Sequence, residues 1–294
     1  MADHQGSNRR VRALSPDGRP PAKGGQPGAR LPPGALWRNP AGGDGRDVIG
    51  PRRPARRGAG VSRVRRRGAP QEPSAVRRRA GRDRSQREFY VAVEGEVTER
   101  DYLEFLNAEF GDDGRFFIHP ITRRHGMKPL GVVERAIDLL ADLPDTDVAE
   151  GRAQVWALFD RDQHSCVAEA FAAAAPTAVH LAFSHPSFDL WLLLHFQNMT
   201  SAEDGSSAAV HTKLRSVDPA YASFGRTGDK SVMGAQTRAL LGREGAAMRH
   251  ARRLVDHCPS GACTAAGGHA ASCPPLQRDP STDVWRLLEA LLAG

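Results

Sequence analysis

The chain has 294 residues, with 41 Lys and Arg side chains against 34 Asp and Glu side chains, so its formal net charge is +7. Residues 1–84 hold 20 Arg and one Lys against six acids, which gives +15, and the remaining 210 residues carry −8. This asymmetry indicates contact with nucleic acid or a membrane surface. The sequence shows no apolar run long enough to span a membrane, no apolar signal-peptide core, and only four Cys, so we expect a cytoplasmic protein without membrane segments or a disulfide framework.

The N-terminal segment is predicted to be a disordered arm. Arg, Gly and Pro dominate residues 1–84, and the scattered apolar side chains offer too little surface to offset the entropy of ordering. The clusters RRPARR at 52–57 and RVRRR at 63–67 would bind phosphates without sequence preference. The alternative is an over-long gene model whose true start lies near residue 85.

The rest of the chain alternates between strand and helix patterns. Apolar, β-rich runs predict strands at residues 89–93, 116–121, 154–159 and 178–183. Helical spacing predicts helices after Thr98, over 130–143 with Val133, Ile137 and Leu140 on one face, in an Ala-rich segment ending near Pro176, and over 188–196. Further along, we expect a loop with one short helix at 200–230, a loop at 257–280, and helices at 236–255 and 283–292. The alternation predicts an α/β fold, a mainly parallel sheet flanked by helices on both faces.

Two of these helices carry capping signals. Thr98, with Asp101 three residues later, resembles a capping box at the start of the first helix. Ser281 or Thr282 is the predicted cap of the last helix.

Acidic residues follow three of the predicted strands. Glu94 comes directly after the first strand, Asp160 and Asp162 follow the third, and Asp189 lies just after the fourth, while Glu99 opens the first helix. Ligands bind at the carboxyl edge of parallel sheets, so we expect these carboxylates to converge there. Clustered carboxylates are tolerable if they hold Mg²⁺ or Mn²⁺. The alternative is that the acids only cap the helices that follow, since a lone DxD is common.

Four segments resemble the RloB-like family. EGEVTERDYLEFL resembles the family's opening "EGxTE…Y", and FDRDQH resembles its third-strand motif. FSHPSFDLWLLLHF is similar to its signature "SNPxFELWLLLHF", and DPSTDVWRLLEAL to its C-terminal "NPSTxVxxLxxxL". The matches occur in the family's order and span residues 88 to 292, so residues 1–84 lie largely outside the resemblance.

The resemblance implies a Toprim-like (Rossmann-like) domain, whose pattern is a Glu after the first strand and a DxD after the third. Glu94, Asp160 and Asp162 match that pattern. In Toprim enzymes the Glu is a general acid/base or metal ligand, and the DxD binds Mg²⁺. We therefore expect an arm at 1–84, a Toprim-like catalytic core at 85–200, and a C-terminal helical extension at 201–294. The family typically occurs beside restriction-modification or other phage-defence genes, which implies a defence role.

The sequence departs from the family pattern at three places. His185 stands where the signature has Asn, and Asp189 stands where it has Glu, so the shorter side chain puts metal contact at this corner in doubt. The Gly-rich stretch after the second strand is reduced to RRHGMKPLG, which weakens the case for a phosphate-binding loop.

Several other residues are candidates for binding. Arg124 and Lys128, with Arg123, follow the second strand and would hold a substrate phosphate, or else form a solvated loop. His164 would bind substrate, shuttle a proton or contact metal, although a His after a DxD often caps the next helix. The order C-x4-C-x5-H-x3-C distantly resembles a zinc knuckle, but with an unfamiliar spacing, in the residues Cys258, Cys263, His269 and Cys273.

Two functions from different classes remain open. The first is a Mg²⁺- or Mn²⁺-dependent endonuclease acting on DNA or RNA, with Glu94, Asp160 and Asp162 in catalysis and Glu99 and Asp189 completing the metal shell. The second is a non-catalytic Toprim scaffold that binds nucleic acid or a partner, such as an ATPase or restriction subunit, in a defence complex. The intact Glu and DxD favour the enzyme.

Overall fold

The computed structural model describes residues 86–111, 113–202 and 206–293, so the predicted arm at 1–84 lies outside the described residues. Its strands are β1 (Arg87–Val93), β2 (Phe116–Ile121), β3 (Ala153–Asp160), β4 (His180–His185) and β5 (Ser281–Thr282). Its α-helices are α1 (Thr98–Phe110), α2 (Pro129–Ala141), α3 (Asp145–Ala149), α4 (Val167–Ala174), α5 (Asp189–Leu194), α6 (Ala208–Val217), α7 (Ala235–Leu240), α8 (Glu244–Asp256) and α9 (Val284–Leu292). Two short 3-10 turns cover Pro219–Tyr221 and Pro275–Gln277.

The strands form one sheet in the order β2-β1-β3-β4-β5. β1 pairs in parallel with β2 and β3, and β3 pairs in parallel with β4, whereas β5 joins the edge antiparallel to β4. β1 and β3 are interior strands, and both are buried toward their carboxyl ends, as expected for strands covered on both faces. The predicted α/β class with a mainly parallel sheet is confirmed.

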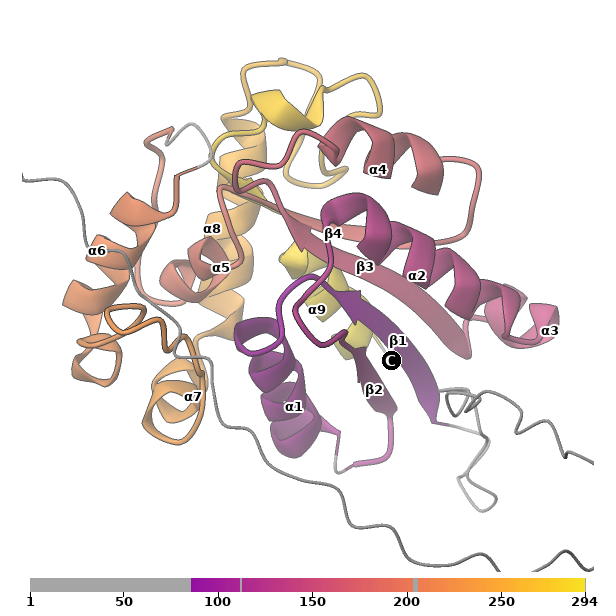
Figure 1. Ribbon diagram of the computed structural model, residues 1–294, viewed down its shortest axis with the longest axis horizontal. Helices are drawn as coiled ribbons and strands as arrows, with labels where there is room; N and C mark the ends of the chain where they lie inside the picture. The colour runs from indigo at the N-terminus through magenta and orange to yellow at the C-terminus, as the bar shows by residue number, and fades with distance from the viewer. Residues whose placement is uncertain (1–85, 112, 203–205, 294) are drawn as a thin grey trace, which may run out of the picture. The chain divides into compact units, whose positions relative to one another are not determined.

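Helices cover both faces of the sheet, and each face has its own apolar core (Figure 1). Alternate residues of β1 enter different cores, with Phe89 and Val91 in one and Tyr90 and Ala92 in the other, because side chains alternate across a strand. The first core contains α1 and α5 to α9, and the second contains α2 and α4. The C-terminal helices thus share a core with α1 and α5.

Most elements lie where the sequence predicts them, with three differences. The predicted helix over 236–255 is two helices, α7 and α8, because Gly242 at φ +77° breaks the chain direction between them. The short strand β5 and the short helix α3 were not predicted. The buried face of α2 is Val132, Val133, Ala136 and Leu139, so the predicted face is displaced, with Ile137 and Leu140 only partly buried.

The predicted capping box at Thr98 is wrong, whereas the Thr282 hydroxyl does accept a hydrogen bond from the Val284 amide at the start of α9, at 3.3 Å. Thr98 is the first residue of α1 rather than its cap, and its hydroxyl donates to the Lys230 carbonyl at 2.9 Å. Asp101 instead accepts from the Ser231 hydroxyl at 2.8 Å and the Val232 amide at 3.2 Å. Thr282 and Ser281 belong to β5, and Asp283 occupies the N-cap of α9 without a side-chain capping hydrogen bond. Long-range contacts therefore use the polar groups that the local pattern assigns to caps.

Among the described residues, no helix is both long and apolar enough to cross a membrane.

Candidate metal centre

Glu94 and Asp160 lie side by side at the carboxyl edge of the sheet. Glu94 follows the last residue of β1, and Asp160 is the last residue of the neighbouring strand β3. The Asp160 amide donates to Glu94 Oε2 at 2.9 Å, and the Glu94 amide donates to the Leu158 carbonyl at 3.1 Å. The parallel pairing of the two strands therefore fixes the position of both acids.

The loop after β3 brings Asp162 and His164 to the same place. Glu94, Asp162 and His164 each offer one ligand atom, and the three atoms lie within 4.8 Å of one another. His164 Nε2 lies 2.8 Å from Glu94 Oε1. The loop is tightly bent, since Asp162 has φ +34°, and its amide donates to the Pro186 carbonyl at 2.9 Å.

Glu99 approaches the site from the first turn of α1. Its carboxylate accepts hydrogen bonds from its own amide and from the Gly95 amide. The approach is so close that a Cβ at residue 95 would lie 2.3 Å from Glu99 Oε2. A side chain at residue 95, in the turn that joins β1 to α1, would therefore displace the Glu99 carboxylate.

Asp160 is the most deeply placed of these acids. The residue is only 8% exposed, and its Oδ1 atom has no hydrogen-bond partner among the described residues. A buried carboxylate oxygen without a partner is costly, because nothing replaces the water that it loses. A ligand that contacts Asp160 Oδ1 would remove this cost.

Asp189 begins α5, and two basic side chains already contact it. His211 Nε2 lies 2.5 Å from Asp189 Oδ2, and Lys230 Nζ lies 3.0 Å from the same oxygen. His211 comes from α6, and Lys230 from the segment that precedes α7. Asp189 thus lies near the other acids, but its carboxylate already contacts a histidine and a lysine of this chain.

Burial and mutual repulsion raise the pKa values of three acids. Burial raises the pKa of Glu94 to about 8, with Asp162 and Glu99 adding to the shift and the Asp160 amide opposing it. Burial likewise raises the pKa of Glu99 to about 7, with Asp189 adding to the shift. Burial, then Glu99, Glu94 and Asp162, raise the pKa of Asp160 well above its usual value. These couplings show that the acids share one electrostatic environment.

The opposite shift at Asp189 follows from its partners. Burial alone would raise the pKa of Asp189, but His211 and Lys230 outweigh it and hold the pKa below its ordinary value. The charge of Asp189 raises the pKa of Lys230 against the effect of burial. Asp189 is therefore ionised at neutral pH, beside acids that retain protons.

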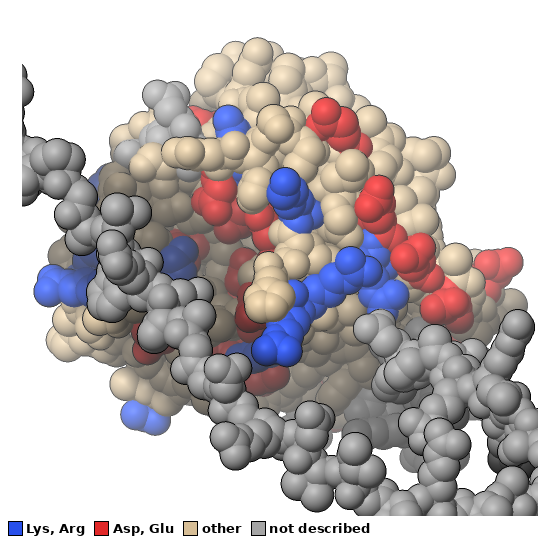
Figure 2. Space-filling view, in the orientation of Figure 1, with Lys and Arg blue, Asp and Glu red and all other residues tan. Residues whose placement is uncertain are grey.

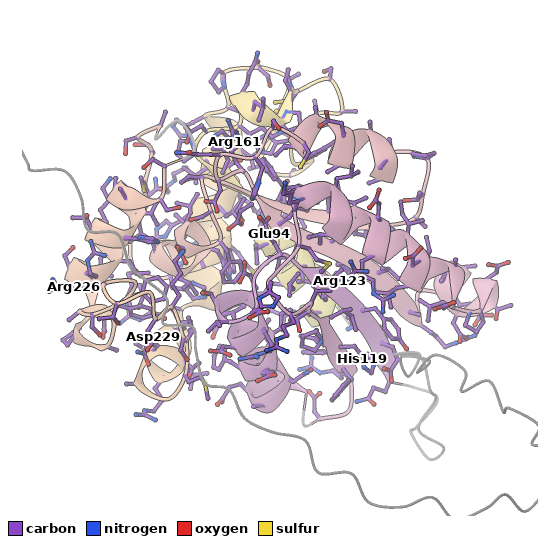
Figure 3. The ribbon with its side chains drawn as sticks, viewed as in Figure 1. Glu94, His119, Arg123, Arg161, Arg226 and Asp229 are labelled. Atoms are coloured by element: carbon purple, nitrogen blue, oxygen red, sulfur yellow. The ribbon has the colours of Figure 1, made fainter. Side chains whose placement is uncertain are left out.

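The basic residues after β2 lie beside this edge. The Met127 amide donates to the Glu94 carbonyl at 3.0 Å, and the His125 amide donates to Glu96, so the loop packs on the turn after β1. Arg124 and Lys128 are exposed on this loop, at positions open to a substrate. Figure 2 shows acidic side chains near the middle of this face with Lys and Arg side chains beside them. Figure 3 shows Glu94 with Arg161 above and Arg123 below it in this view.

The acids predicted from the sequence thus lie close to one another. The sequence did not predict the two basic residues that contact Asp189, which are His211 and Lys230. His211 and Lys230 lie in a stretch that reads as mixed polar loop, 22 and 41 residues after Asp189. No local spacing links them to an acid, so only the tertiary fold reveals the pairing. For His164, adjacency to the DxD was the available signal.

The family model described as RloB-like protein matches residues 89–291. The chain belongs to this family. The matched region of this RloB-like protein contains every acid of the site as well as His211 and Lys230, and it leaves residues 1–84 outside. No curated protein and no solved structure shows a detectable similarity to the chain.

Proposed function

We propose that this RloB-like protein is a metal-dependent nuclease of the Toprim type, which hydrolyses phosphodiester bonds of DNA or RNA in phage defence. The observation that carries the proposal is the buried carboxylate of Asp160. Its Oδ1 atom has no hydrogen-bond partner among the described residues, and Glu94, Glu99 and Asp162 lie near enough to raise its pKa. A divalent cation would offset the repulsion of these carboxylates and give that oxygen a partner.

The donor set fits a hard cation. Glu94, Asp162 and His164 offer ligand atoms within 4.8 Å of one another, and Asp160, whose pKa Glu99, Glu94 and Asp162 all raise, would add a further carboxylate oxygen. Oxygen donors of this kind suit Mg²⁺ or Mn²⁺. When bound, such an ion would activate water and stabilise the leaving oxygen of a phosphodiester. Because Asp189 already contacts His211 and Lys230, its role would be to hold these two side chains beside the site rather than to bind the ion.

The remaining groups would position the substrate and move protons. Glu94, with a pKa of about 8, would donate a proton at neutral pH and act as a base once a bound cation has displaced that proton, and His164 Nε2 lies 2.8 Å from Glu94 Oε1. Arg124 and Lys128, on the exposed loop beside Glu94, would hold the substrate backbone. Lys230 adds a positive charge near Asp160 and Asp162.

The test is cleavage of labelled DNA and RNA by the purified full chain in Mg²⁺, Mn²⁺ or EDTA, with the Asp160→Asn variant in parallel. Asparagine keeps the size of the side chain but removes its charge. We expect metal-dependent cleavage by the parent, and a loss of about two or more orders of magnitude in the variant, as for removal of a main electrostatic element.

Two controls make the result interpretable. Asp138→Asn removes an equal charge from the exposed face of α2 and should leave cleavage unchanged. Leu193→Ala truncates a fully buried side chain, so it should cost about 2–5 kcal/mol of stability while the folded fraction stays active. If Asp160→Asn cleaves as fast as the parent, Asp160 is not part of the site, and if the parent shows no metal-dependent cleavage, the enzyme proposal fails.

The rival function is a non-catalytic scaffold that binds nucleic acid or a partner such as an ATPase or restriction subunit. Its supporting observation is that His211 and Lys230 already contact the Asp189 carboxylate. The outcome that favours it is metal-independent binding of nucleic acid with no cleavage, even when the native defence partners are added.

A further inference from the structure

A second group of metal-binding side chains lies far along the chain from the acidic site. Cys258 follows α8, and Cys263, His269 and Cys273 lie in the long loop between α8 and β5. One ligand atom from each of these four residues lies within 4.8 Å of every other. The unfamiliar sequence spacing therefore folds into a single compact cluster.

The distances within the cluster match the edges of a tetrahedron. Cys258 Sγ lies 3.6 Å from Cys273 Sγ, and His269 Nδ1 lies 3.3 Å from Cys263 Sγ. A tetrahedral zinc ion with sulfur at about 2.3 Å and nitrogen at about 2.0 Å would separate its ligands by about 3.5–3.8 Å. The side chains thus need little movement to surround an ion.

The surroundings suit thiolates bound to a cation. Cys263 Sγ accepts from the Ala270 amide at 3.4 Å and lies 3.0 Å from the Ser260 hydroxyl. Three thiolates and one Zn²⁺ carry a net charge of −1, and the buried Arg278 guanidinium donates to the Cys273 carbonyl at 2.8 Å. A cation placed beside the cluster would balance that charge, as the outer groups of metal sites commonly do.

The loop has little else to hold it together. Its apolar cluster consists of Val255 and the three cysteines, with Ala270 packed against it. Between α8 and β5 the regular structure consists of the 3-10 turn Pro275–Gln277 and a single β-bridge between Thr264 and Gly268. Segments too small for an apolar core are commonly stabilised by a structural metal.

We propose that Cys258, Cys263, His269 and Cys273 form a structural zinc site of the Cys3His class. Four protein ligands leave no open coordination position, so the site fixes the loop rather than performing chemistry. The loop leads directly into β5, whose Ser281 and Thr282 pair with β4. The zinc therefore holds the edge strand against the sheet.

The test is the metal content of the full chain, purified in a thiol reductant without chelator. We expect about one zinc per chain, and a fall to background in Cys263→Ser and in Cys273→Ser. Cys166→Ser is the matched control, because this cysteine precedes α4 outside the cluster, and it should keep its zinc. Zinc near background in the parent, or equal loss in the Cys166→Ser control, would overturn the proposal.

Cobalt exchange tests the parent chain directly, in case the cysteine variants fold poorly. Co²⁺ in a Cys3His site gives an intense thiolate-to-metal absorption and tetrahedral visible bands, whereas Co²⁺ on carboxylates alone gives neither. We expect the thiolate absorption, with equal intensity in Asp160→Asn. Its absence overturns the proposal, as does a parent mass lower by the two hydrogens of a disulfide. The readout is independent of nuclease activity, so the two proposals can fail separately.

Discussion

At the scale of single residues, the site is a set of acids whose burial and mutual repulsion destabilise their charged forms. Glu94 and Glu99 have pKa values of about 8 and about 7, far above the ordinary value of 4.5 for a glutamate. Burial is the main cause for both. Such perturbed groups in one place are typical of a functional site.

These shifts predict how stability depends on pH. Between pH 4.5 and about 8 the folded protein binds more protons at Glu94 and Glu99 than the unfolded chain does. Stability should therefore fall as pH rises through this window. Mg²⁺ binds only the ionised form, so it should raise the melting temperature more at pH 8 than at pH 5.

Thermal melts at both pH values, with and without Mg²⁺, measure this effect. In Asp160→Asn one of the repelling acids is absent, so the fall with pH should be shallower and the Mg²⁺ response weaker. A melting temperature that rises from pH 5 to pH 8 in the metal-free parent would contradict the arrangement of protonated acids.

At the scale of elements, the turn between β1 and α1 controls the position of Glu99. The Gly95 amide donates to the Glu99 carboxylate, and a Cβ at residue 95 would lie 2.3 Å from Glu99 Oε2. Gly95 is not in the left-handed region, so a side chain there would act on the Glu99 carboxylate and not on the backbone conformation.

Gly95→Ala is therefore expected to move one carboxylate with little effect on folding. The end of the Glu99 side chain can rotate away, so the melting temperature should change little, while the stabilisation by Mg²⁺ should fall to the level of Glu99→Gln. Gly131→Ala in α2 is the matched control, since its nearest atom lies 4.0 Å away. It should be neutral or stabilise by up to about 1 kcal/mol, with the full Mg²⁺ response. Equal Mg²⁺ responses in the two variants would contradict this role of the turn.

Local patterns predict some elements better than others, and the reasons are physical. The strand Phe116–Ile121 is found at its predicted bounds, because a β-rich run between polar residues leaves few alternatives. The break at Gly242 was missed because the helical spacing continues across it. The two-residue β5 has no pattern of its own and exists only by pairing with β4.

The candidate site also combines residues that local patterns predict with residues that only the tertiary fold brings together. Acids at strand ends are visible in the sequence because parallel strands end at a common edge. Lys230 and His211 are not visible, because their approach to Asp189 depends on how α6 and the segment before α7 pack on α5. The cysteine cluster was visible as residue types, but its spacing gave no indication that the loop closes on itself.

At the scale of the whole molecule, charge is divided between the N-terminal 84 residues at +15 and the rest at −8. An acidic region does not attract a polyanion by itself. The basic segment would supply that attraction through phosphate contacts and counterion release.

Removal of residues 1–84 is expected to weaken nucleic-acid binding and to flatten its dependence on salt, since fewer phosphates are neutralised. The melting temperature should be nearly unchanged, because these residues offer little apolar surface. Binding titrations across several salt concentrations and a thermal melt measure both effects. An unchanged salt slope would show that the segment does not contact nucleic acid, and a large drop in melting temperature would show that it packs on the rest.

The contacts between α1 and the segment at 230–232 set the order in which the protein can mature during synthesis. Thr98 and Asp101 bond to residues that are 130 to 132 positions later in the chain, and Lys230 also holds Asp189. A ribosome releases all the acids before it releases Lys230. A nascent chain therefore cannot complete the contacts of Asp189 with Lys230, or those of α1 with residues 230–232, until most of its length has emerged.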